Sequence, residues 1–519
     1  MSSRVRVKSK TGRIYVYEVE SFWNKAKKKP DSHRKCIGHI DEVSGELVPN
    51  RPRSKAKQSL STVKSSSTFT AEGIGNFALI DRTAVDTGLL ECLKDVFPVE
   101  WPYIMTCCQY LCGSGNPLYR CERWSVHNTT YLDRPLSSQR ISVLLTVLTP
   151  DRQREFFRAW IAHNGAKEYF ALDITSVSSY SELIGLVKYG YNRDHEDLPQ
   201  INLLMITGEK SHVPIYFLPL DGKIKDIKAL KSAIADESMI ASDRLSLIMD
   251  KGFYSAQNLD ALYDSRMRFA VGVPFSSKIA KEAVEKNRNL IESHHNMISV
   301  LGNEVYGTTE PQKWKGHRLY THVYFDSDKA AGERKEFHKK LCRAYEQLTH
   351  SQTPDDPEFA RKYLIVTETP VRGRKVKYNE DEINKHLKGH VGWFVLVSNF
   401  IKDTTEALTI YREKDSVEKS FDDLKHQHDM KRLRVHSEEA MNGRLFLQFL
   451  SLILTVSIRK KLAEEDWSNR YSLRQIMDEI GELKQIKPAS GKSRKKVVLA
   501  TTPLQDQIIE LFELSPSYV

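Results

Sequence analysis

The stretch EYFALDITSVS, residues 168–178, predicts a β-strand, because apolar, aromatic and β-branched residues make up most of it. Asp173 lies in its middle. Aspartate is depleted in strands, and burying a carboxylate without a partner is costly. We therefore expect Asp173 to have a functional role, although a buried hydrogen bond to Ser176 or Ser178 would also satisfy it.

The segments after this strand have the patterns of a hairpin, a helix, a strand, a helix and a strand. The strand after the first of these helices, RLSLIMD, ends on Asp250, and Ser255 has the position of an N-cap for the next helix. In chain order the segments are 201–222, 223–238, 244–250, 255–265 and 267–275. This order predicts an α/β fold with a mixed sheet of ribonuclease-H type.

The predicted sheet is interrupted and then resumes. GWFVLVSNF, residues 392–400, returns as a strand after a long segment rich in Lys, His and Glu. The most apolar run, LFLQFLSLILTVSI at 445–458, is shorter than the ~20 residues that a membrane-spanning helix needs. We therefore expect it to be a buried core helix, and we expect no membrane partner.

Positive charge is concentrated near the N-terminus. The chain has 519 residues and a net charge of +11, and residues 1–64 hold sixteen Lys and Arg against six Asp and Glu. Residues 4–23 alternate as a β-hairpin does, and RPRSKAKQSLSTVKSSSTF at 51–69 predicts a linker. A basic module on a nearly neutral body indicates binding to a polyanion. A solubilising arm is the alternative.

The cysteines indicate a reducing compartment. Seven cysteines, an odd number in a chain that starts without a signal peptide, are expected to be reduced thiols of a cytoplasmic protein. Four of them cluster, but not with paired C-x-x-C spacing, so core packing is favoured over zinc binding. The clustered residues are Cys107, Cys108, Cys112 and Cys121.

Three carboxylates are candidates for one site. Asp173 lies in a strand, Asp250 ends the next buried strand, and Glu418 lies in YREKDSVEKSFDDLK at 411–425, which predicts a helix. Converging acids repel one another unless a divalent cation compensates them, and oxygen ligands suit Mg²⁺ or Mn²⁺. Two such ions activate a nucleophile and stabilise a leaving oxygen in phosphoryl transfer. Alone, Asp250 could equally be a turn residue and Glu418 a solvated ion-pair partner. Their order in the chain is the more specific signal.

The helix predicted at 411–425 also resembles a known signature. Residues four or seven apart share a helix face, which aligns Tyr411, Lys414, Glu418 and Lys425. This spacing resembles that of the DDE transposases of prokaryotic insertion sequences, in the group with the Tyr-Arg-Glu-Lys signature. Lys414 replaces the arginine, which keeps the charge but loses bidentate phosphate contact, and Arg412 could compensate in part. Other similar stretches are YGYNRDHEDLPQINLLM, MDKGFYS, LRVHSEEAMNGRLFLQFLSLIL and IGHIDEVSGELVPN.

The resemblance implies roles for these residues. Asp173, Asp250 and Glu418 would bind two Mg²⁺ ions, with Mn²⁺ as an alternative. It also implies double-stranded DNA as substrate, both terminal inverted repeats and target DNA, a homodimer on that DNA, and a cytoplasmic, nucleoid-associated location. The residues expected to hold the DNA backbone near the cleaved phosphate are Tyr411, Arg412, Lys414 and Lys425.

Trp314 is a further candidate for DNA binding. It lies in QKWKGHR, within the interrupting segment, and could stack on an unpaired base at a cleaved end. Packing inside that segment is the alternative, and it is the more frequent role of a tryptophan.

The predicted function is that of a transposase. It would bind the inverted repeats of its insertion sequence, cleave the DNA ends by two-metal hydrolysis and transfer the 3′-hydroxyl ends to target DNA. The alternatives are a ribonuclease-H-like nuclease without strand transfer, and an inactive DNA-binding relic. The predicted parts are a basic β-rich module (1–58), a linker (59–69), a helical DNA-binding region (70–168), the first part of the catalytic core (169–276), an insertion domain (277–390), the second part of the core (391–465) and a basic tail (466–519).

Overall fold

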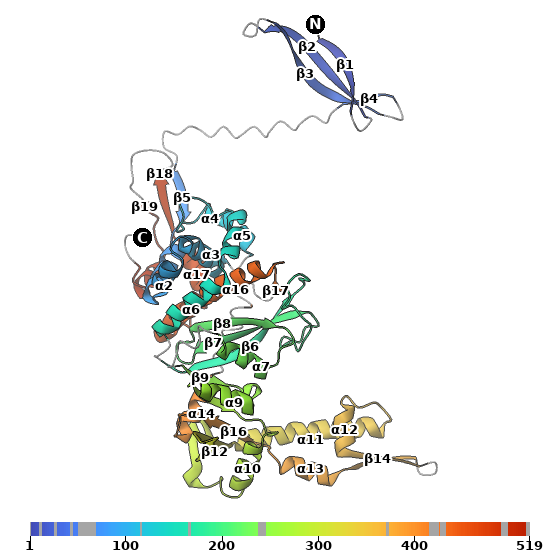
Figure 1. The fold of residues 1–519 in the computed structure, drawn as a ribbon, viewed down its shortest axis with the longest axis vertical. Coiled ribbons are helices and arrows are strands. Elements are labelled where there is room, and N and C mark those ends of the chain that lie inside the picture. Colours follow the sequence, from blue (N-terminus) through green and yellow to red (C-terminus); the bar gives the residue numbers. More distant parts are fainter. Residues whose placement is uncertain are drawn as a thin grey trace. The chain divides into compact units, whose positions relative to one another are not determined.

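The computed structural model describes residues 2–9, 13–24, 29–41, 45–49, 69–114, 117–164, 168–236, 245–369, 373–414, 425, 432–488 and 497–514. The chain divides into two units, which are drawn in Figure 1. The small unit comprises Met1–Phe69 and Pro488–Lys492, and the large unit comprises Thr70–Lys487 and Ser493–Val519.

The small unit is an antiparallel sheet. β1 (Ser2–Lys8), β2 (Ile14–Asn24), β3 (Lys29–Ile40) and β4 (Leu47–Pro49) are neighbours in that order. Val16 and Val19 supply its buried hydrophobic side chains within the described residues, whereas the basic side chains of β1 are exposed. The sheet therefore has little core and presents much of its positive charge to solvent.

The large unit begins with a helical region and a short sheet. Ser137 caps one of these helices, because its hydroxyl accepts a hydrogen bond from the backbone N–H of Arg140. The short sheet has the order β19 (Val497–Val498), β18 (Lys484–Pro488) and β5 (Phe69–Gly73). Two helices, α17 (Leu473–Gly481) and α18 (Pro503–Leu511), belong to the same C-terminal part of the chain. The helices of the first region are α1 (Gly75–Asp86), α2 (Leu89–Val96), α3 (Trp101–Ser114), α4 (Cys121–Ser125), α5 (Ser138–Val147) and α6 (Pro150–Asn164).

A large mixed sheet forms the centre of this unit, as the sequence predicts. β6, which carries Asp173, pairs antiparallel with β7, which pairs antiparallel with β8. On its other side β6 pairs parallel with β9, and β9 pairs parallel with β10. The resulting order, β8-β7-β6-β9-β10, is the arrangement expected of a ribonuclease-H-type sheet. Bounds are β6 (Phe170–Ser179), β7 (Gln200–Gly208), β8 (Pro214–Asp221), α7 (Asp226–Ile234), β9 (Ser246–Met249), α9 (Ala256–Asp264), β10 (Arg268–Gly272) and β17 (Arg432–Leu433), which pairs with β6.

The segment at 277–390, predicted as one insertion domain, consists of two parts, and only the second is separate from the central sheet. Its first part continues the sheet in the order β11-β12-β13-β16-β10, because β13 pairs with β16 and β16 with β10. These elements are α10 (Lys278–Asn287), β11 (Met297–Val300), β12 (Asn303–Trp314), β13 (His317–Phe325) and β16 (Trp393–Ser398). The second part has its own hydrophobic cluster and contains α11 (Ser327–Thr349), α12 (Pro357–Tyr363), β14 (Leu364–Thr369), β15 (Gly373–Tyr378) and α13 (Glu380–Leu387). Hereafter this second part is called the insertion.

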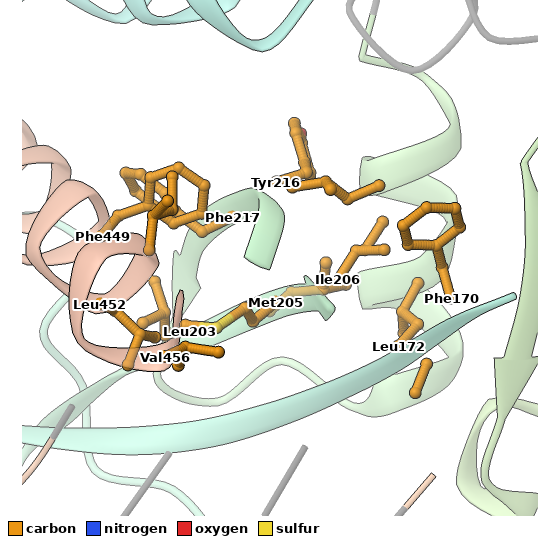
Figure 2. Packing of buried hydrophobic residues seen from close by; sticks show 14 of the residues in the cluster. Phe170, Leu172, Leu203, Met205, Ile206, Tyr216, Phe217, Phe449, Leu452 and Val456 are labelled. Carbon is orange, nitrogen blue, oxygen red and sulfur yellow. The ribbon is translucent and has the colours of Figure 1, made fainter. Parts of the chain in front are cut away.

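Helices cover both faces of the sheet. α16 (Glu438–Glu464) packs on one face, where Phe449 lies 5.1 Å from the ring of Phe217 in β8 and near Leu203 of β7 (Figure 2). α14 (Thr404–Glu413) covers the other face, where Ala407 and Ile410 join a cluster with residues of β9 and β10. Alternate residues of each strand thus meet different helices.

α16 confirms the core helix predicted at 445–458 and extends it at both ends. By length and composition alone this helix could cross a membrane, but 89% of its most apolar window is buried inside the protein. Cys108 and Cys112 of α3 lie 3.7 and 3.5 Å from backbone carbonyls of α16. All four clustered cysteines are buried and free, so they pack the core as the sequence favours.

Candidate active site

Asp173 and Asp250 lie at matching positions on neighbouring parallel strands. Leu172 of β6 is in register with Met249 of β9, so the aspartates are the next residues along each strand. Ile248 belongs to the cluster beneath α14, and residues two apart on a strand share a face. Asp250 therefore emerges on the α14 face. By the same alternation from Ala171, which is in register with Ile248, Asp173 lies on that face too.

Ser176 and Ser178 do not satisfy the Asp173 carboxylate. Their hydroxyls donate to Asn202 and Glu196, respectively, and alternation places them on the opposite face of β6. The Asp173 carboxylate accepts a hydrogen bond from the backbone N–H of Ile174 at 2.7 Å. Burial raises the pKa of Asp173 to about 6, the Ile174 hydrogen bond lowers it, and the Asp250 charge adds to the rise.

Two residues of the signature contact Asp250. The Lys414 ammonium lies 2.8 Å from its carboxylate, and the Tyr411 hydroxyl donates to it at 3.1 Å. A Cβ at position 272 would lie 2.7 Å from the Tyr411 hydroxyl oxygen, so the glycine there makes room for the tyrosine. Lys414 and Tyr411 thus join α14 to the acidic edge of the sheet.

Glu418 lies outside the described residues, as does most of the helix predicted at 411–425. α14 starts earlier than that prediction, at Thr404, because the Asp403 side chain accepts a hydrogen bond from Glu406 N and caps the helix. It ends at Glu413, with Lys414 as its C-cap. Among the described residues, no group of three or more His, Cys, Asp and Glu side chains is placed to hold a metal ion.

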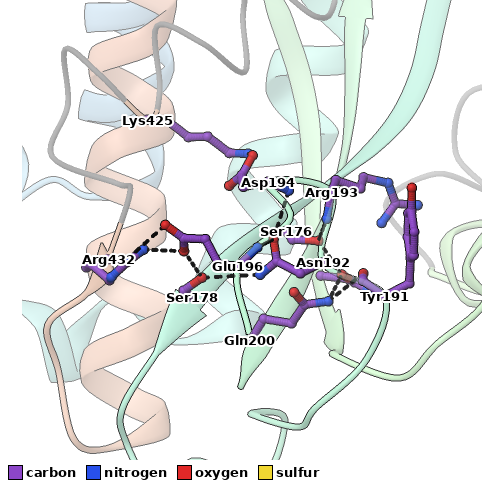
Figure 3. Close-up of polar contacts among 11 residues, drawn as sticks. Ser176, Ser178, Tyr191, Asn192, Arg193, Asp194, Glu196, Gln200, Lys425 and Arg432 are labelled. Atoms are coloured by element: carbon purple, nitrogen blue, oxygen red, sulfur yellow. Dashed lines mark hydrogen bonds and ion pairs between the residues drawn. The ribbon is translucent and has the colours of Figure 1, made fainter. Parts of the chain in front are cut away.

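Lys425 is placed away from solvent. Its side chain is only 9% exposed, and its ammonium lies 2.5 Å from the carboxylate of Asp194. Asp194 belongs to the loop between β6 and β7, which a polar network fixes to the sheet (Figure 3). In this network Asn192 donates to Ser178, and Arg432 donates to Glu196 at 2.9 Å. Asp194, Asn192 and Glu196 lie in the stretch YGYNRDHEDLP, which forms the second half of this loop.

Arg412 is directed toward a neighbouring part of the sheet. Its guanidinium lies 3.3 Å from the Asp326 carboxylate and donates to the carbonyl of Val300. Asp326, Arg412 and Asp250 line one cavity of about 790 Å³. Lys329 and Glu333 of α11 line the same cavity, so the insertion borders the candidate site.

Trp314 lies at the end of β12, in the hairpin with β13. Its indole N–H donates to the Asp260 carboxylate of α9 at 2.9 Å, and Lys315 pairs with the same carboxylate at 2.7 Å. The side chain is partly buried against the main core. These contacts hold the tryptophan side chain against the protein. Its stacking on an unpaired DNA base stays a prediction.

Glu209 is an unusual carboxyl that no sequence motif indicates. It directly follows β7, its side chain is 2% exposed, and neither carboxylate oxygen has a hydrogen-bond partner in the described structure. Burial, and then the neighbouring Glu413 carboxyl, raise the pKa of Glu209 to about 8. Only the tertiary structure reveals this environment, because a lone glutamate after a strand resembles an ordinary turn residue.

Glu209→Gln should stabilise the protein selectively at high pH. The folded-state pKa of about 8 exceeds the ordinary value of 4.5, so wild-type stability falls as the pH rises from 4.5 through about 8. Glutamine does not ionise, and the advantage of the variant therefore grows over that interval. Thermal unfolding in acidic and alkaline buffers measures this difference, with the exposed Glu182→Gln as control. An equal difference at both pH values would contradict the prediction.

The mixed sheet with helices on both faces, and the two aspartates at matching positions of its parallel strands, define an α/β protein with an acidic sheet edge. The family described as "Transposase DDE domain" matches residues 165–454, and the chain belongs to this family. This confirms the DDE transposase resemblance, although the match does not distinguish the group with the Tyr-Arg-Glu-Lys signature.

The comparison with solved structures gives a remote likeness. A cryo-EM structure of a piggyBac transposase synaptic complex with hairpin DNA matches with a TM-score of 0.33 and 11% sequence identity. The match covers 64% of this chain and 56% of that chain. Nothing about this chain is inferred from so distant a likeness. Comparison with curated proteins gives no significant match.

Proposed function

We propose that this chain is an active DNA transposase. It binds the terminal inverted repeats of its element, cleaves the element ends with the help of divalent cations, and joins the resulting 3′-hydroxyl ends to target DNA. The observation that carries this proposal is the Asp173–Asp250 pair, at matching positions of parallel strands in a chain of the DDE transposase family.

The acidic edge fits a divalent cation. Asp173 is partly buried beside Asp250, and burial first, then the Asp250 charge, raise its pKa, so ionising both carboxylates without a cation is costly. Asp173, Asp250 and Glu418 would hold two Mg²⁺ ions, with Mn²⁺ as an alternative. When bound, such ions activate water and stabilise the leaving oxygen of a phosphodiester.

The cations of the protein have complementary roles. Lys414 neutralises Asp250 in the free protein, and it can turn to a DNA phosphate once Asp250 has another cationic partner. Tyr411 orients the Asp250 carboxylate through its hydroxyl. Arg412 is anchored to Asp326 beside the same cavity and extends positive charge along it. Lys414 and Arg412 would thus bind the DNA backbone, and Tyr411 would orient the Asp250 carboxylate.

Two copies of the chain would act together, because two element ends must be joined in one event. The basic small unit and the helices at 70–168 would recognise the repeats, in the cytoplasm and at the nucleoid. The exposed basic side chains of β1 support this assignment.

The test uses labelled duplex carrying the inverted repeats that flank the coding sequence, with unlabelled plasmid as target. Wild-type protein is compared with Glu418→Gln, which keeps the side-chain shape and removes the charge. We expect cutting at the repeat edge only with Mg²⁺ or Mn²⁺ and only in the wild type, followed by labelled joined products. Cutting without joining would identify a nuclease. Binding without cutting, identical in both proteins, would leave a DNA-binding relic.

A further inference from the structure

The insertion carries a two-stranded ribbon. β14 and β15 pair antiparallel over their full length and form a separate sheet within the described residues. An isolated pair of strands is marginally stable by itself, so such a ribbon depends on what its faces contact.

The register separates the side chains of the ribbon into two faces. Directly opposed residues of an antiparallel pair point to the same side. The inner face has the pairs Leu364–Tyr378, Val366–Val376 and Glu368–Arg374. The outer face has the pairs Ile365–Lys377, Thr367–Lys375 and Thr369–Gly373.

The inner face of the ribbon packs on helix α11 of the same insertion. Leu364 and Val376 are buried and belong to the insertion's hydrophobic cluster, with Phe337 and Leu341 of α11. The ring of Tyr378 stacks on Tyr345 of α11 at 4.8 Å. The outer face is therefore directed away from α11.

The outer face is cationic and contains no acid. All of its members are exposed, including Ile365 at 47%. Neither Lys375 nor Lys377 has an ion-pair partner among the residues that the structure describes, whereas Arg374 on the inner face stands opposite Glu368. Lys375 and Lys377 are two residues apart on β15 and so ~6.7 Å apart along the strand. This is close to the axial distance that two successive nucleotides of one DNA strand cover.

We propose that this outer face, called the ribbon face, binds the phosphate backbone of duplex DNA beside the cleavage site. The inference rests on the proposed function and extends it to the insertion. A two-stranded ribbon has the width that a DNA major groove admits, and the ammonium groups of Lys375 and Lys377 are suited to phosphate oxygens. The lack of any carboxylate on this face favours DNA over a basic or neutral protein partner.

The position of the ribbon fits DNA that passes the acidic edge. Glu333 of α11 lines the cavity that contains Asp250, and Tyr345 under the ribbon lies twelve residues further along that helix. At 1.5 Å per residue this is roughly 18 Å, or about five base pairs. The ribbon face would therefore contact DNA about half a helical turn from the cavity.

The test compares the full-length variants Lys375→Gln, Lys377→Gln and their double variant with Arg374→Gln, which removes one charge from the inner face of the same strand and so matches each single variant. Binding to a fixed duplex is measured over a range of KCl concentrations. We expect the double variant to lose affinity about tenfold and its log–log salt slope to fall by about 2, since each phosphate contact contributes ~0.9. Arg374→Gln should leave the slope unchanged, and Lys375→Arg/Lys377→Arg should keep the wild-type slope.

Two outcomes would overturn the inference. If wild type binds DNA and the Gln double variant has the same affinity and slope, the ribbon face does not bind DNA, and the proposed transposase function stands. If the double variant loses self-association in sedimentation while its slope is unchanged, the ribbon face contacts a second copy of the chain. A wild type without any DNA binding would instead refute the proposed function. Exposed Lys→Gln changes should leave thermal unfolding unaltered.

Discussion

Asp173→Asn is expected to lower metal-dependent DNA cleavage by about a thousandfold or more. Asparagine keeps the shape of the side chain but cannot supply the negative charge that holds a divalent cation next to Asp250. Because both carboxylates act as one site, the double variant Asp173→Asn/Asp250→Asn should cleave DNA only slightly more slowly than either single variant. Cleavage of labelled repeat duplex under saturating protein and Mg²⁺ measures the effect.

The binding and stability of this variant separate catalysis from folding. Its DNA affinity should equal or exceed that of the wild type, because a negative charge beside the phosphates has been removed. Its thermal stability should not decrease, since a partly buried carboxylate has become neutral. Asp221→Asn, at the end of β8 in the same sheet, is the control and should cleave normally. Wild-type cleavage by Asp173→Asn would locate the chemistry elsewhere.

The centre of the fold could be predicted from the sequence because its strands are short, apolar and separated by clear turn and helix signals. The proximity of Asp173 and Asp250 also follows, since neighbouring parallel strands bring aligned positions together, here a position within β6 and the residue after β9. The strands at 297–325 are harder to assign. Most residues of β11 and β12 are exposed or partly buried, so these strands resemble the surface of an insertion and not the continuation of a sheet.

Long-range partners account for most of what the sequence could not reveal. Asp194 and Lys425 are 231 residues apart, and no local pattern indicates that they form an ion pair. The family resemblance assigns Lys425 to the DNA backbone, whereas in the structure its side chain is only 9% exposed and is paired with Asp194 of the loop after β6. Tertiary contacts, and not helix periodicity, decide the environment of this residue.

Lys425→Met and Asp194→Asn are each expected to lower cleavage by about 10²-fold. The ion pair holds the Lys425 side chain against the β6–β7 loop, and small displacements of catalytic groups have effects of this size. The double variant should be no worse than either single variant, because both changes remove the same contact. Single-turnover cleavage of the four proteins gives this cycle.

DNA binding distinguishes a positioning role for Lys425 from direct phosphate contact. If Asp194 holds the lysine during the reaction, the salt slope of DNA binding is the same for Lys425→Met and wild type. If the lysine instead binds a phosphate, Lys425→Met lowers the slope by about 1, and Asp194→Asn, which frees the lysine, cleaves as well as wild type.

Loss of stability must be separated from loss of position. Glu100 and Arg152 form a partly buried ion pair at 2.9 Å in the helical region, so Glu100→Gln breaks a comparable contact away from the site. Both Glu100→Gln and Asp194→Asn should lower the free energy of unfolding by about 2 kcal/mol. Below the temperature at which either protein unfolds, Glu100→Gln should cleave DNA normally and Asp194→Asn should not. Equal cleavage by both variants would mean that the Asp194–Lys425 pair only stabilises the fold.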